Sequence, residues 1–287
     1  MKVFGPTSWP CIVLLLVLLE ARATIPSEEH RPTAHYINLD RRPDRRAFME
    51  AEFDRHGVHR AFNVSRFRAF DGKATEFTPA QLALFDRADF KGLYNFNVLV
   101  ANQLSHLSVW EDLLASAAPW AVVLQDDAAL AQGFVDGVLR VFQARPDDAA
   151  VIWIGLHHFA SGAFSLPFPL EGGYDPDMFS AAIPGNDVVG RTTWNPCSLG
   201  YVLTRPGARW LVDHFRATGF SRATDNAMND ALTAQDRQYI SRRVLCTGHG
   251  AFMHDSDIFG AHDQPSLAPV YTERYRQAEK ARGVGEF

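Results

Sequence analysis

The segment 120–127, WAVVLQDD, constrains the fold more than any other part of the sequence, because an apolar run ends there in two adjacent acids. The run predicts a buried strand, and Asp126 and Asp127 at its tip would be costly to desolvate without compensation. Open α/β sheets bind their ligands beyond the carboxyl ends of parallel strands. Paired carboxylates there suit Mg²⁺ or Mn²⁺, the cations that accompany diphosphates. An Asp-Asp turn or a helix N-cap is the alternative interpretation.

The rest of the chain alternates apolar strand patterns with amphipathic helix patterns. Strands are expected at 34–40, 66–70, 120–126, 149–155, 197–204 and 242–246. Helices are expected from Pro43 to Gly57, at 98–117, around 134–142, from Pro206 onwards and at 224–234. This alternation predicts an α/β fold with a mostly parallel sheet flanked by helices. The segment 157–193 is rich in Gly, Pro, Ser and Asp and predicts a long irregular loop.

The composition is that of a globular domain. The chain has 287 residues, of which 47% are hydrophobic and 21% charged, and its formal net charge is −5. It has no basic patch interleaved with aromatic residues, so we expect no nucleic-acid partner. We expect one domain at 24–265, followed by a polar, peripheral tail at 266–287.

The N-terminal segment has the features of a signal peptide covering residues 1–23. Lys2 precedes an apolar run at 11–19, and Ala21-Arg22-Ala23 resembles a cleavage site. The run is short for a spanning helix, although an uncleaved anchor is the alternative. We therefore expect a chain without a stable membrane span after cleavage, in the lumen of the endoplasmic reticulum or Golgi, or secreted.

Two further patterns agree with that compartment. Asn63 begins the sequon Asn-Val-Ser and is a candidate glycosylation site. Removal of the signal peptide would leave one pair of cysteines, Cys197 and Cys246. They form either a disulfide or two buried thiols in neighbouring strands, and the sequence does not fix their distance.

The first expected strand runs directly into a basic helix start, which contains Arg42 and Arg45. Cations at a helix N-terminus oppose the helix dipole, so local helix physics disfavours them. Arginines at this place suit a diphosphate, which the guanidinium fork can bind, or a nucleobase, on which it can stack. A solvated charge run is the alternative.

Two weaker patterns also contain candidate polar groups. Asp71, with Gly72 after it, ends the second expected strand, where its carboxylate could bind a uracil edge or a ribose, or could cap a turn. His106 follows Ser105 on the long helix at 98–117. It is either a donor whose protonation can be tuned or a packed residue beside core leucines.

The C-terminal half adds two candidates. Asp225 lies at the start of a predicted helix and could be the general base that removes a hydroxyl proton, or an acid that favours the helix dipole. His254 precedes two nearby acids, Asp255 and Asp257, and could be a metal ligand. That pattern is weak by itself.

Taken in order, these segments resemble glycosyltransferase family 25, which includes procollagen galactosyltransferases and bacterial lipooligosaccharide galactosyltransferases. The resemblance covers most of 34–262. It rests on YINLDRRPDRR at 36–46, FRAFDGKA at 67–74, LSHLSVW at 104–110, VVLQDDA at 122–128, SLGYVLTRPGA at 198–208, TDNAM at 224–228 and HDSDI at 254–258. It implies a GT-A-like, Rossmann-type fold. It also implies inverting transfer of a sugar, expected to be galactose, from a UDP donor to a collagen-like hydroxylysine or a glycan.

The resemblance also implies roles for individual residues. The donor-binding set would be Asn38, Leu39, Arg42, Arg45, Asp71, Gly72, Ser105, His106 and Gln125. Asp126, Asp127 and His254 would hold Mn²⁺. Asp225 would be the catalytic base.

Two departures from the family pattern leave activity open. Gln125 stands where the family usually has Glu, and Leu99 lies in a segment where the family usually has Gly-Glu-x-Gly-Cys. Loss of a charged hydrogen-bond partner costs about 1.5–3 kcal/mol. The alternative function is therefore a catalytically inactive member that acts as a binding or adhesion module. A nucleotide-sugar hydrolase is less favoured, because the sequence has no nucleophile-activating constellation.

Overall fold

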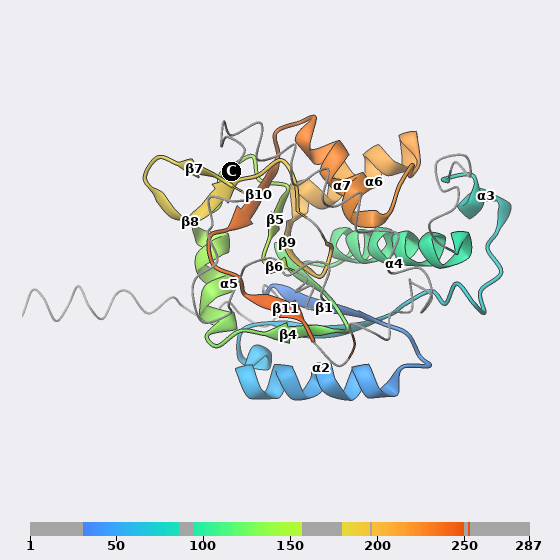
Figure 1. Cartoon of the computed structure of the whole chain (residues 1–287), viewed down its shortest axis with the longest axis horizontal. Helices are drawn as coiled ribbons and strands as arrows, with labels where there is room; N and C mark the ends of the chain where they lie inside the picture. The colour runs from blue at the N-terminus through green and yellow to red at the C-terminus, as the bar shows by residue number, and fades with distance from the viewer. Residues whose placement is uncertain (1–30, 86–94, 157–179, 196, 250–251, 253–287) are drawn as a thin grey trace, which may run out of the picture.

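The computed structural model describes residues 31–85, 95–156, 180–195, 197–249 and 252 (Figure 1). The expected signal peptide at 1–23, the tail at 266–287 and His254 lie outside the described residues. Across the described ranges, strands and helices alternate along the chain and build a central sheet with helices packed against it. The α/β fold predicted from the sequence is confirmed.

The main sheet has eight strands in the order β2-β1-β3-β9-β5-β10-β8-β7. Their bounds, in that order, are Asn63–Arg68, Thr33–Asn38, Trp120–Gln125, Gly200–Thr204, Val151–Trp153, Gln238–Ser241, Asn186–Arg191 and Ala181–Ile183. Strands β8 and β9 run antiparallel to their neighbours, and the other six run in one direction. The expected dominance of one strand direction is therefore present, and the arrangement is consistent with a GT-A-like fold.

A second, smaller sheet continues from the main one. It has the order β4-β11-β6, with β4 at Ala128–Leu130, β11 at Cys246–Gly248 and β6 at Gly155–Leu156. Strand β4 begins just after β3 ends, and β6 begins just after β5 ends. The chain therefore passes from the large sheet to the small one after β3, after β5 and after β10, and the first of these points is the acid pair.

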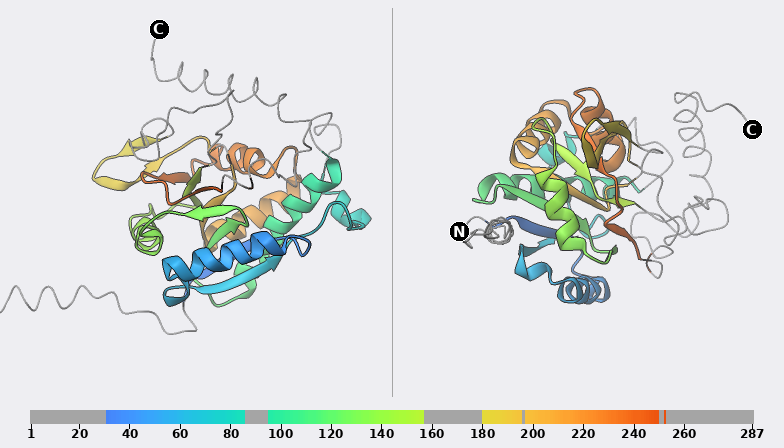
Figure 2. Two further views of the ribbon diagram at one scale, coloured as in Figure 1. Left: turned by 60° about the horizontal axis from the view of Figure 1, so that its bottom comes forward. Right: turned by 90° about the vertical axis from the view of Figure 1, so that its left-hand side faces the viewer.

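Helices cover both faces of the main sheet (Figure 2). They are α2 at Pro43–His56, α4 at Phe96–Ala115, α5 at Phe134–Gln143, α6 at Arg205–Thr218 and α7 at Thr224–Thr233, with short helices η2 at Val58–Arg60 and α3 at Pro79–Leu82. One core cluster contains residues of α4, α6 and α7, and the other contains residues of α2 and α5.

Strand β3 is buried between these two clusters. Ala121 and Val123 belong to the cluster on the α4 side, whereas Trp120, Val122 and Leu124 belong to the cluster on the α2 side. Alternate side chains of a strand point to opposite faces, so a strand that is apolar at every position must be covered on both faces. The apolar run that ends in the acid pair is thus an interior strand of the main sheet.

Local sequence signals place the helix ends as expected. Pro43 is at the start of α2, and Gly57 closes the helix with a φ of +66°, a left-handed conformation that favours glycine. The hydroxyl of Thr204 accepts a hydrogen bond from the backbone N–H of Gly207 and caps α6. These two boundaries follow from capping chemistry that the sequence displays.

Two expectations about the later part of the chain are wrong. Residues 181–191, expected to be irregular, contain the hairpin β7–β8, which turns at Gly185 with a φ of +76°. The strand expected at 242–246 is replaced by β10 at Gln238–Ser241 and β11 at Cys246–Gly248. Both errors have a tertiary cause. Strand β8 is held by pairing with β10, and buried Gln238 is stabilised by accepting a hydrogen bond from the indole N–H of Trp153 at 2.9 Å.

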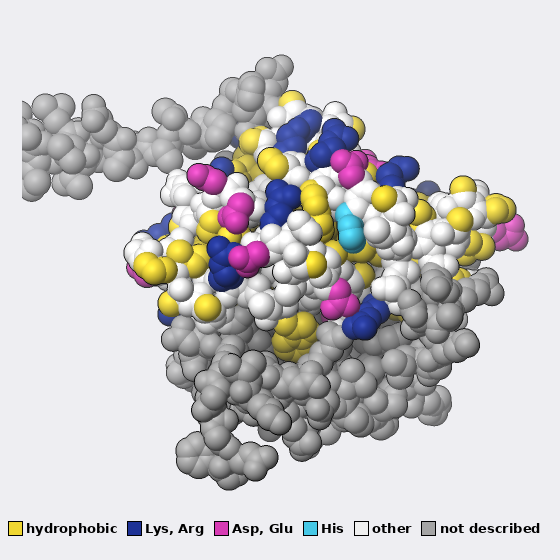
Figure 3. All heavy atoms as spheres, turned by 90° about the horizontal axis from the view of Figure 1, so that it is seen from above, with side chains coloured by type: hydrophobic (Ala, Val, Ile, Leu, Met, Phe, Trp, Pro, Cys, Tyr) yellow, Lys and Arg dark blue, Asp and Glu magenta, His cyan; other side chains and the backbone are white. Residues whose placement is uncertain are grey.

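The surface shows no concentration of one charge on the face seen in Figure 3. Basic and acidic side chains are interspersed there, with hydrophobic side chains scattered among them. In the part of the chain that the structure describes, we find no helix that is both long enough and apolar enough to cross a membrane.

We predict that Gly207→Ala destabilises the protein. A Cβ atom at this position would lie 2.6 Å from the Cα atom of Ala150, which immediately precedes β5. The backbone of α6 or the backbone at Ala150 would therefore have to shift. Such overpacking typically costs about 1–3 kcal/mol, and urea unfolding measures it. The matched control is Gly137→Ala, where the Cβ would meet only the flexible end of Leu245 at 2.5 Å. Equal losses for the two variants would contradict the packing argument.

Candidate functional site

The acid pair lies where the chain leaves the main sheet. Strand β3 ends at Gln125 and β4 begins at Ala128, so Asp126 and Asp127 form the link. The backbone carbonyl of Asp127 accepts a hydrogen bond from the backbone N–H of His249 at 2.8 Å, next to β11. The backbone of the pair is therefore held by both sheets, at the carboxyl end of a strand that runs parallel to β1.

The two acids are buried against an arginine and an asparagine. Nη1 of Arg45 lies 2.9 Å from Oδ1 of Asp126 and 3.5 Å from Oδ2 of Asp127. The amide of Asn38 donates to Oδ2 of Asp126 at 2.7 Å. Burial raises the pKa of Asp126, and the positive charge of Arg45 opposes that rise. The pair is thus a polar cluster inside the fold and not an exposed turn.

Arg42 and Arg45 are buried, which excludes a solvated charge run for these two residues. Arg42 pairs with Asp44 at 2.7 Å, and this hydrogen bond lowers the pKa of Asp44 to about 2. The guanidinium of Arg45 lies 5.0 Å from the centre of the Phe252 ring, and that of Arg42 lies 5.8 Å from it. The start of α2 therefore presents two arginines beside the acid pair.

Asn38 connects the strand ends to this cluster. It is fully buried at the end of β1, donates to the backbone carbonyl of Arg42 and accepts from Nε of Arg66 at 2.9 Å. Arg66 also reaches Asp40 at 2.7 Å, so it joins β2 to the loop that contains Leu39. A role for Arg66 is not predictable from the sequence, because an arginine in a half-exposed strand carries no local signal of such a role.

The turn after β2 is packed on the first half of α4. Asp71 pairs with Nε of Arg41 at 2.7 Å and accepts from the backbone N–H of Lys73. A Cβ atom on Gly72 would lie 2.5 Å from the Cα atom of Val98, so only glycine fits this close approach. The hydroxyl of Ser105 accepts from the backbone N–H of Phe70 at 3.0 Å. The structure therefore brings Asp71, Gly72 and Ser105 together.

His106 is fully buried between α4 and β9. Its Nδ1 atom lies 2.8 Å from the hydroxyl oxygen of Tyr201, which also accepts from the indole N–H of Trp110 at 2.9 Å. Either the Tyr201 hydroxyl or the His106 ring donates in this hydrogen bond, depending on the tautomer of His106. Burial lowers the pKa of His106 to about 3. The packed-residue alternative fits these contacts, and a donor-binding role stays a prediction.

Gln125 faces the start of β9. Its side-chain amide donates to the hydroxyl of Ser198 at 2.9 Å, and its backbone N–H donates to the carbonyl of Leu199. Asp225 lies half-buried in the first turn of α7. The neighbouring hydroxyl of Thr224 donates to Asn102 on α4, so α7 begins near the part of α4 that contacts the turn after β2. The catalytic role of Asp225 stays a prediction.

The donor set of the acid pair fits a divalent cation that is shared with a diphosphate. Among the described residues, no three His, Cys, Asp or Glu side chains gather in a way that could hold a metal ion. The pair supplies two carboxylates, and cations such as Mg²⁺ are commonly held by one or two carboxylates together with substrate phosphates. The expected third ligand, His254, lies outside the described residues.

Cys197 and Cys246 are both buried thiols in the structure, and a disulfide between them stays a prediction. Burial raises the pKa of the Cys246 thiol, and the nearby Cys197 raises it further. Asn63 is exposed at the start of β2, where a glycan has access, and its modification stays a prediction.

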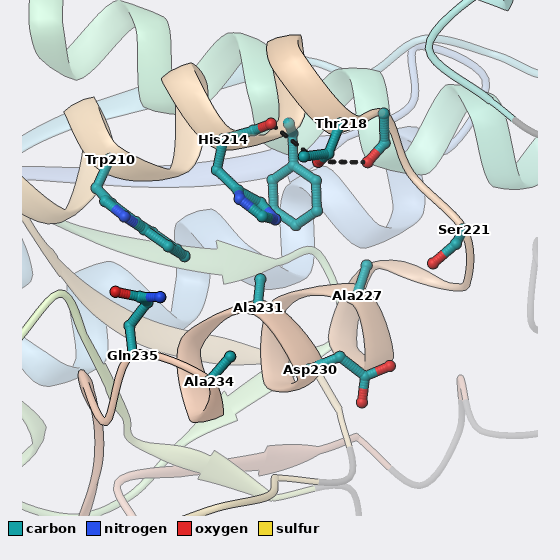
Figure 4. A pocket seen from close by; sticks show the side chains of 11 residues that line it. Trp210, His214, Thr218, Ser221, Ala227, Asp230, Ala231, Ala234 and Gln235 are labelled. Atoms are coloured by element: carbon teal, nitrogen blue, oxygen red, sulfur yellow. Dashed lines mark hydrogen bonds between the residues drawn. The ribbon is translucent and has the colours of Figure 1, made fainter.

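A cavity of about 360 Å³ lies between α6 and α7, apart from the acid pair (Figure 4). Trp210 and His214 face it from α6, and Ala231 and Asp230 face it from α7. The ring of Trp210 stacks on His214, with centres 4.9 Å apart. At 100° per residue, Asp225 lies on the other side of α7 from these lining residues, so the cavity is not part of the candidate site.

Comparisons with known proteins agree with the order of these segments. Residues 32–159 match the family described as "Glycosyltransferase family 25 (LPS biosynthesis protein)". A protein of Acanthamoeba polyphaga mimivirus, described as "Putative glycosyltransferase R655", is 31% identical over 121 residues. This part of the chain belongs to glycosyltransferase family 25. The alignment with the mimivirus protein covers 42% of this chain and 36% of that protein, so the chain spans little more than a third of its relative. The family 25 region contains the arginines of α2, the turn after β2 and the acid pair.

We predict that the stability of the protein falls as the pH falls below about 6.5. Burial lowers the pKa of His106 to about 3 and that of His35 to about 4, so the unfolded chain binds protons in this range that the folded chain does not. Each such histidine adds a slope of up to about 1.4 kcal/mol per pH unit. Urea unfolding between pH 7 and 4 measures the slope. His106→Gln should reduce it by one histidine's share, and an unchanged slope would contradict the assignment.

Proposed function

We propose that the chain is a UDP-sugar-dependent glycosyltransferase that transfers a sugar, galactose, with inversion at the anomeric carbon. The observation that carries the proposal is the buried acid pair at the carboxyl end of β3, beside two arginines at the start of α2. Family 25 membership supports the reaction class. The donor sugar and the inversion rest on the family resemblance alone.

The proposed mechanism assigns each charged group one task. Arg42 and Arg45 would bind the oxygens of the diphosphate through their planar forks. Asp126 and Asp127 would hold Mn²⁺, which neutralises the negative charge of the leaving diphosphate when it is bound. Asp71 would accept hydrogen bonds from the nucleoside. These residues lie around the carboxyl ends of β1, β2 and β3, where open α/β sheets place ligands.

Asp225 is the proposed base. It would take the proton of the acceptor hydroxyl as the hydroxyl oxygen bonds to the anomeric carbon and the bond from that carbon to the diphosphate oxygen breaks. Attack from the face opposite the leaving diphosphate inverts the configuration. A well-placed base contributes about 10²–10⁴-fold in rate.

We propose a glycan or a collagen-like protein as the acceptor, in the lumen of the secretory pathway. The apolar N-terminal run at 11–19 and the exposed sequon at Asn63 support that compartment. The acceptor proposal follows from the compartment and from the family resemblance.

A second candidate, a catalytically silent binding module, is favoured by two positions. Leu99 is 2% exposed and packs in the core on the α4 side, where the family usually has a glutamate. The neutral side-chain amide of Gln125 donates a hydrogen bond to the hydroxyl of Ser198. Both positions replace a charged side chain of the family pattern with a neutral one.

We predict that Asp127→Ala and Asp225→Ala affect different steps. Asp127→Ala should abolish Mn²⁺-dependent UDP binding, whereas Asp225→Ala should preserve binding and reduce turnover about 10²–10⁴-fold. UDP release is followed with Mn²⁺, a UDP-sugar panel and hydroxylysine-containing or glycan acceptors, and UDP binding is measured by calorimetry. The control is Asp213→Ala, because Asp213 is exposed on α6.

The same assay decides between the two functions. Binding of UDP without turnover would favour the silent module, and absence of both would overturn the enzyme proposal. If Asp127→Ala and Asp225→Ala both leave turnover intact, the residue assignment is wrong.

We predict that Gln125→Glu increases turnover. A carboxylate at this position would restore a charged hydrogen-bond partner, worth about 1.5–3 kcal/mol or about 10- to 150-fold. The Ser198 hydroxyl, which now accepts from Gln125, could then donate to the carboxylate. The comparison variant Ser198→Ala removes the present partner of Gln125 without adding charge. Turnover that is equal or lower in Gln125→Glu would show that this chain does not use the family's glutamate.

A further inference from the structure

Arg45 lies at the place between the two acids where a shared cation would bind. One guanidinium nitrogen, Nη1, is 2.9 Å from Oδ1 of Asp126 and 3.5 Å from Oδ2 of Asp127. The exposed fractions of the three side chains are 7% for Arg45, 11% for Asp126 and 13% for Asp127. Two carboxylates this close and this buried need a positive charge beside them, and in this structure Arg45 supplies it.

Both carboxylate oxygens of Asp126 are already engaged. Oδ1 is paired with Arg45, and Oδ2 accepts a hydrogen bond from the amide of Asn38 at 2.7 Å. Arg45 is held in turn by the ring of Phe252 at 5.0 Å and by the backbone carbonyl of Phe252 at 3.4 Å. A cation of the Mg²⁺ class contacts its oxygen ligands at about 2.0–2.1 Å. It could not bridge Oδ1 of Asp126 and Oδ2 of Asp127 while Nη1 is there.

We propose that Arg45 is the resident counter-ion of the acid pair and competes with the divalent cation for it, until a diphosphate draws the arginine away. The inference rests on the proposed function, because it takes the diphosphate of the donor as the partner that Arg45 turns to. Arginine binds phosphate oxygens through its planar fork, and the diphosphate also provides further ligands for the cation. Arg45 would then exchange one anionic partner for another.

This exchange makes cation binding and nucleotide binding depend on each other. Without nucleotide, the cation must break the Arg45–Asp126 ion pair and should bind weakly. With nucleotide, that pair is already open and the cation should bind more tightly. Coupling between two ligands is reciprocal, so the cation must strengthen nucleotide binding by the same factor.

The test is direct binding of Mn²⁺ and of UDP, each alone and in the presence of the other, by calorimetry and electron paramagnetic resonance. For Arg45→Gln we expect Mn²⁺ alone to bind about 10- to 150-fold more tightly than to the unsubstituted protein, since no ion pair has to break. UDP should then strengthen Mn²⁺ binding less than it does in the unsubstituted protein.

Two further variants control for charge and for folding. Arg46→Gln removes the same charge one residue along, but Arg46 pairs with Glu50 at 2.8 Å on the exposed side of α2, so its Mn²⁺ affinity should not change. Arg45→Lys keeps a positive charge beside the buried acids, and its point charge cannot form the planar fork. Arg45→Lys should show a Mn²⁺ affinity between those of the unsubstituted protein and Arg45→Gln. If circular dichroism shows that Arg45→Gln is unfolded, Arg45→Lys replaces it in the comparison.

The outcomes separate the inference from the function on which it rests. If the folded Arg45 variants bind Mn²⁺ no more tightly than the unsubstituted protein, the proposed competition is wrong. The proposed function still stands in that case if the unsubstituted protein binds UDP together with Mn²⁺. If the unsubstituted protein and the Arg45 variants bind neither Mn²⁺ nor UDP, both are overturned. Tighter Mn²⁺ binding by the Arg45 variants with a reduced effect of UDP supports the inference.

Discussion

The cost of burying two adjacent carboxylates is the constraint on which this structure depends. Asp126 and Asp127 follow a strand that is covered on both faces, so solvent is not available to compensate their charge. Arg45 from α2 compensates this charge by an ion pair with Asp126, and Asn38 from β1 donates a hydrogen bond to the same carboxylate. These partners are distant in sequence, and only a parallel arrangement of β1 beside β3 brings them to the same edge.

That arrangement links the core to the site. Packing of β3 between the two hydrophobic clusters fixes the position of the acid pair, and the return of the chain through β4 and β11 fixes its backbone. The close approach of Gly72 to α4 brings the nucleoside-side candidates to the neighbouring strand end. These side chains are positioned by paired strands, which would suit the proposed binding of a diphosphate in one orientation.

The same residues suggest how a family 25 site can be both stable and ready to bind. An acid pair without its ligand would be a buried, uncompensated charge, and Arg45 prevents this by acting as an internal cation. Gln125, the residue before the acid pair, is neutral and adds no charge for Arg45 to balance. If the acid pair holds a cation as proposed, the ion pair that stabilises it would oppose cation binding through one arginine.

The sequence by itself determined the α/β class, the helix ends at Pro43 and Gly57 and the acid pair at the tip of a buried strand, because strand and helix periods and capping residues act over short distances. Collinear motifs also indicated the family. The tertiary structure decided which groups meet: the burial of Arg42 and Arg45, the link from Arg66 to Asn38, the burial of the two cysteines, and the strands β8 and β10. These depend on pairing and packing between segments far apart in the chain, for which a local pattern carries no signal.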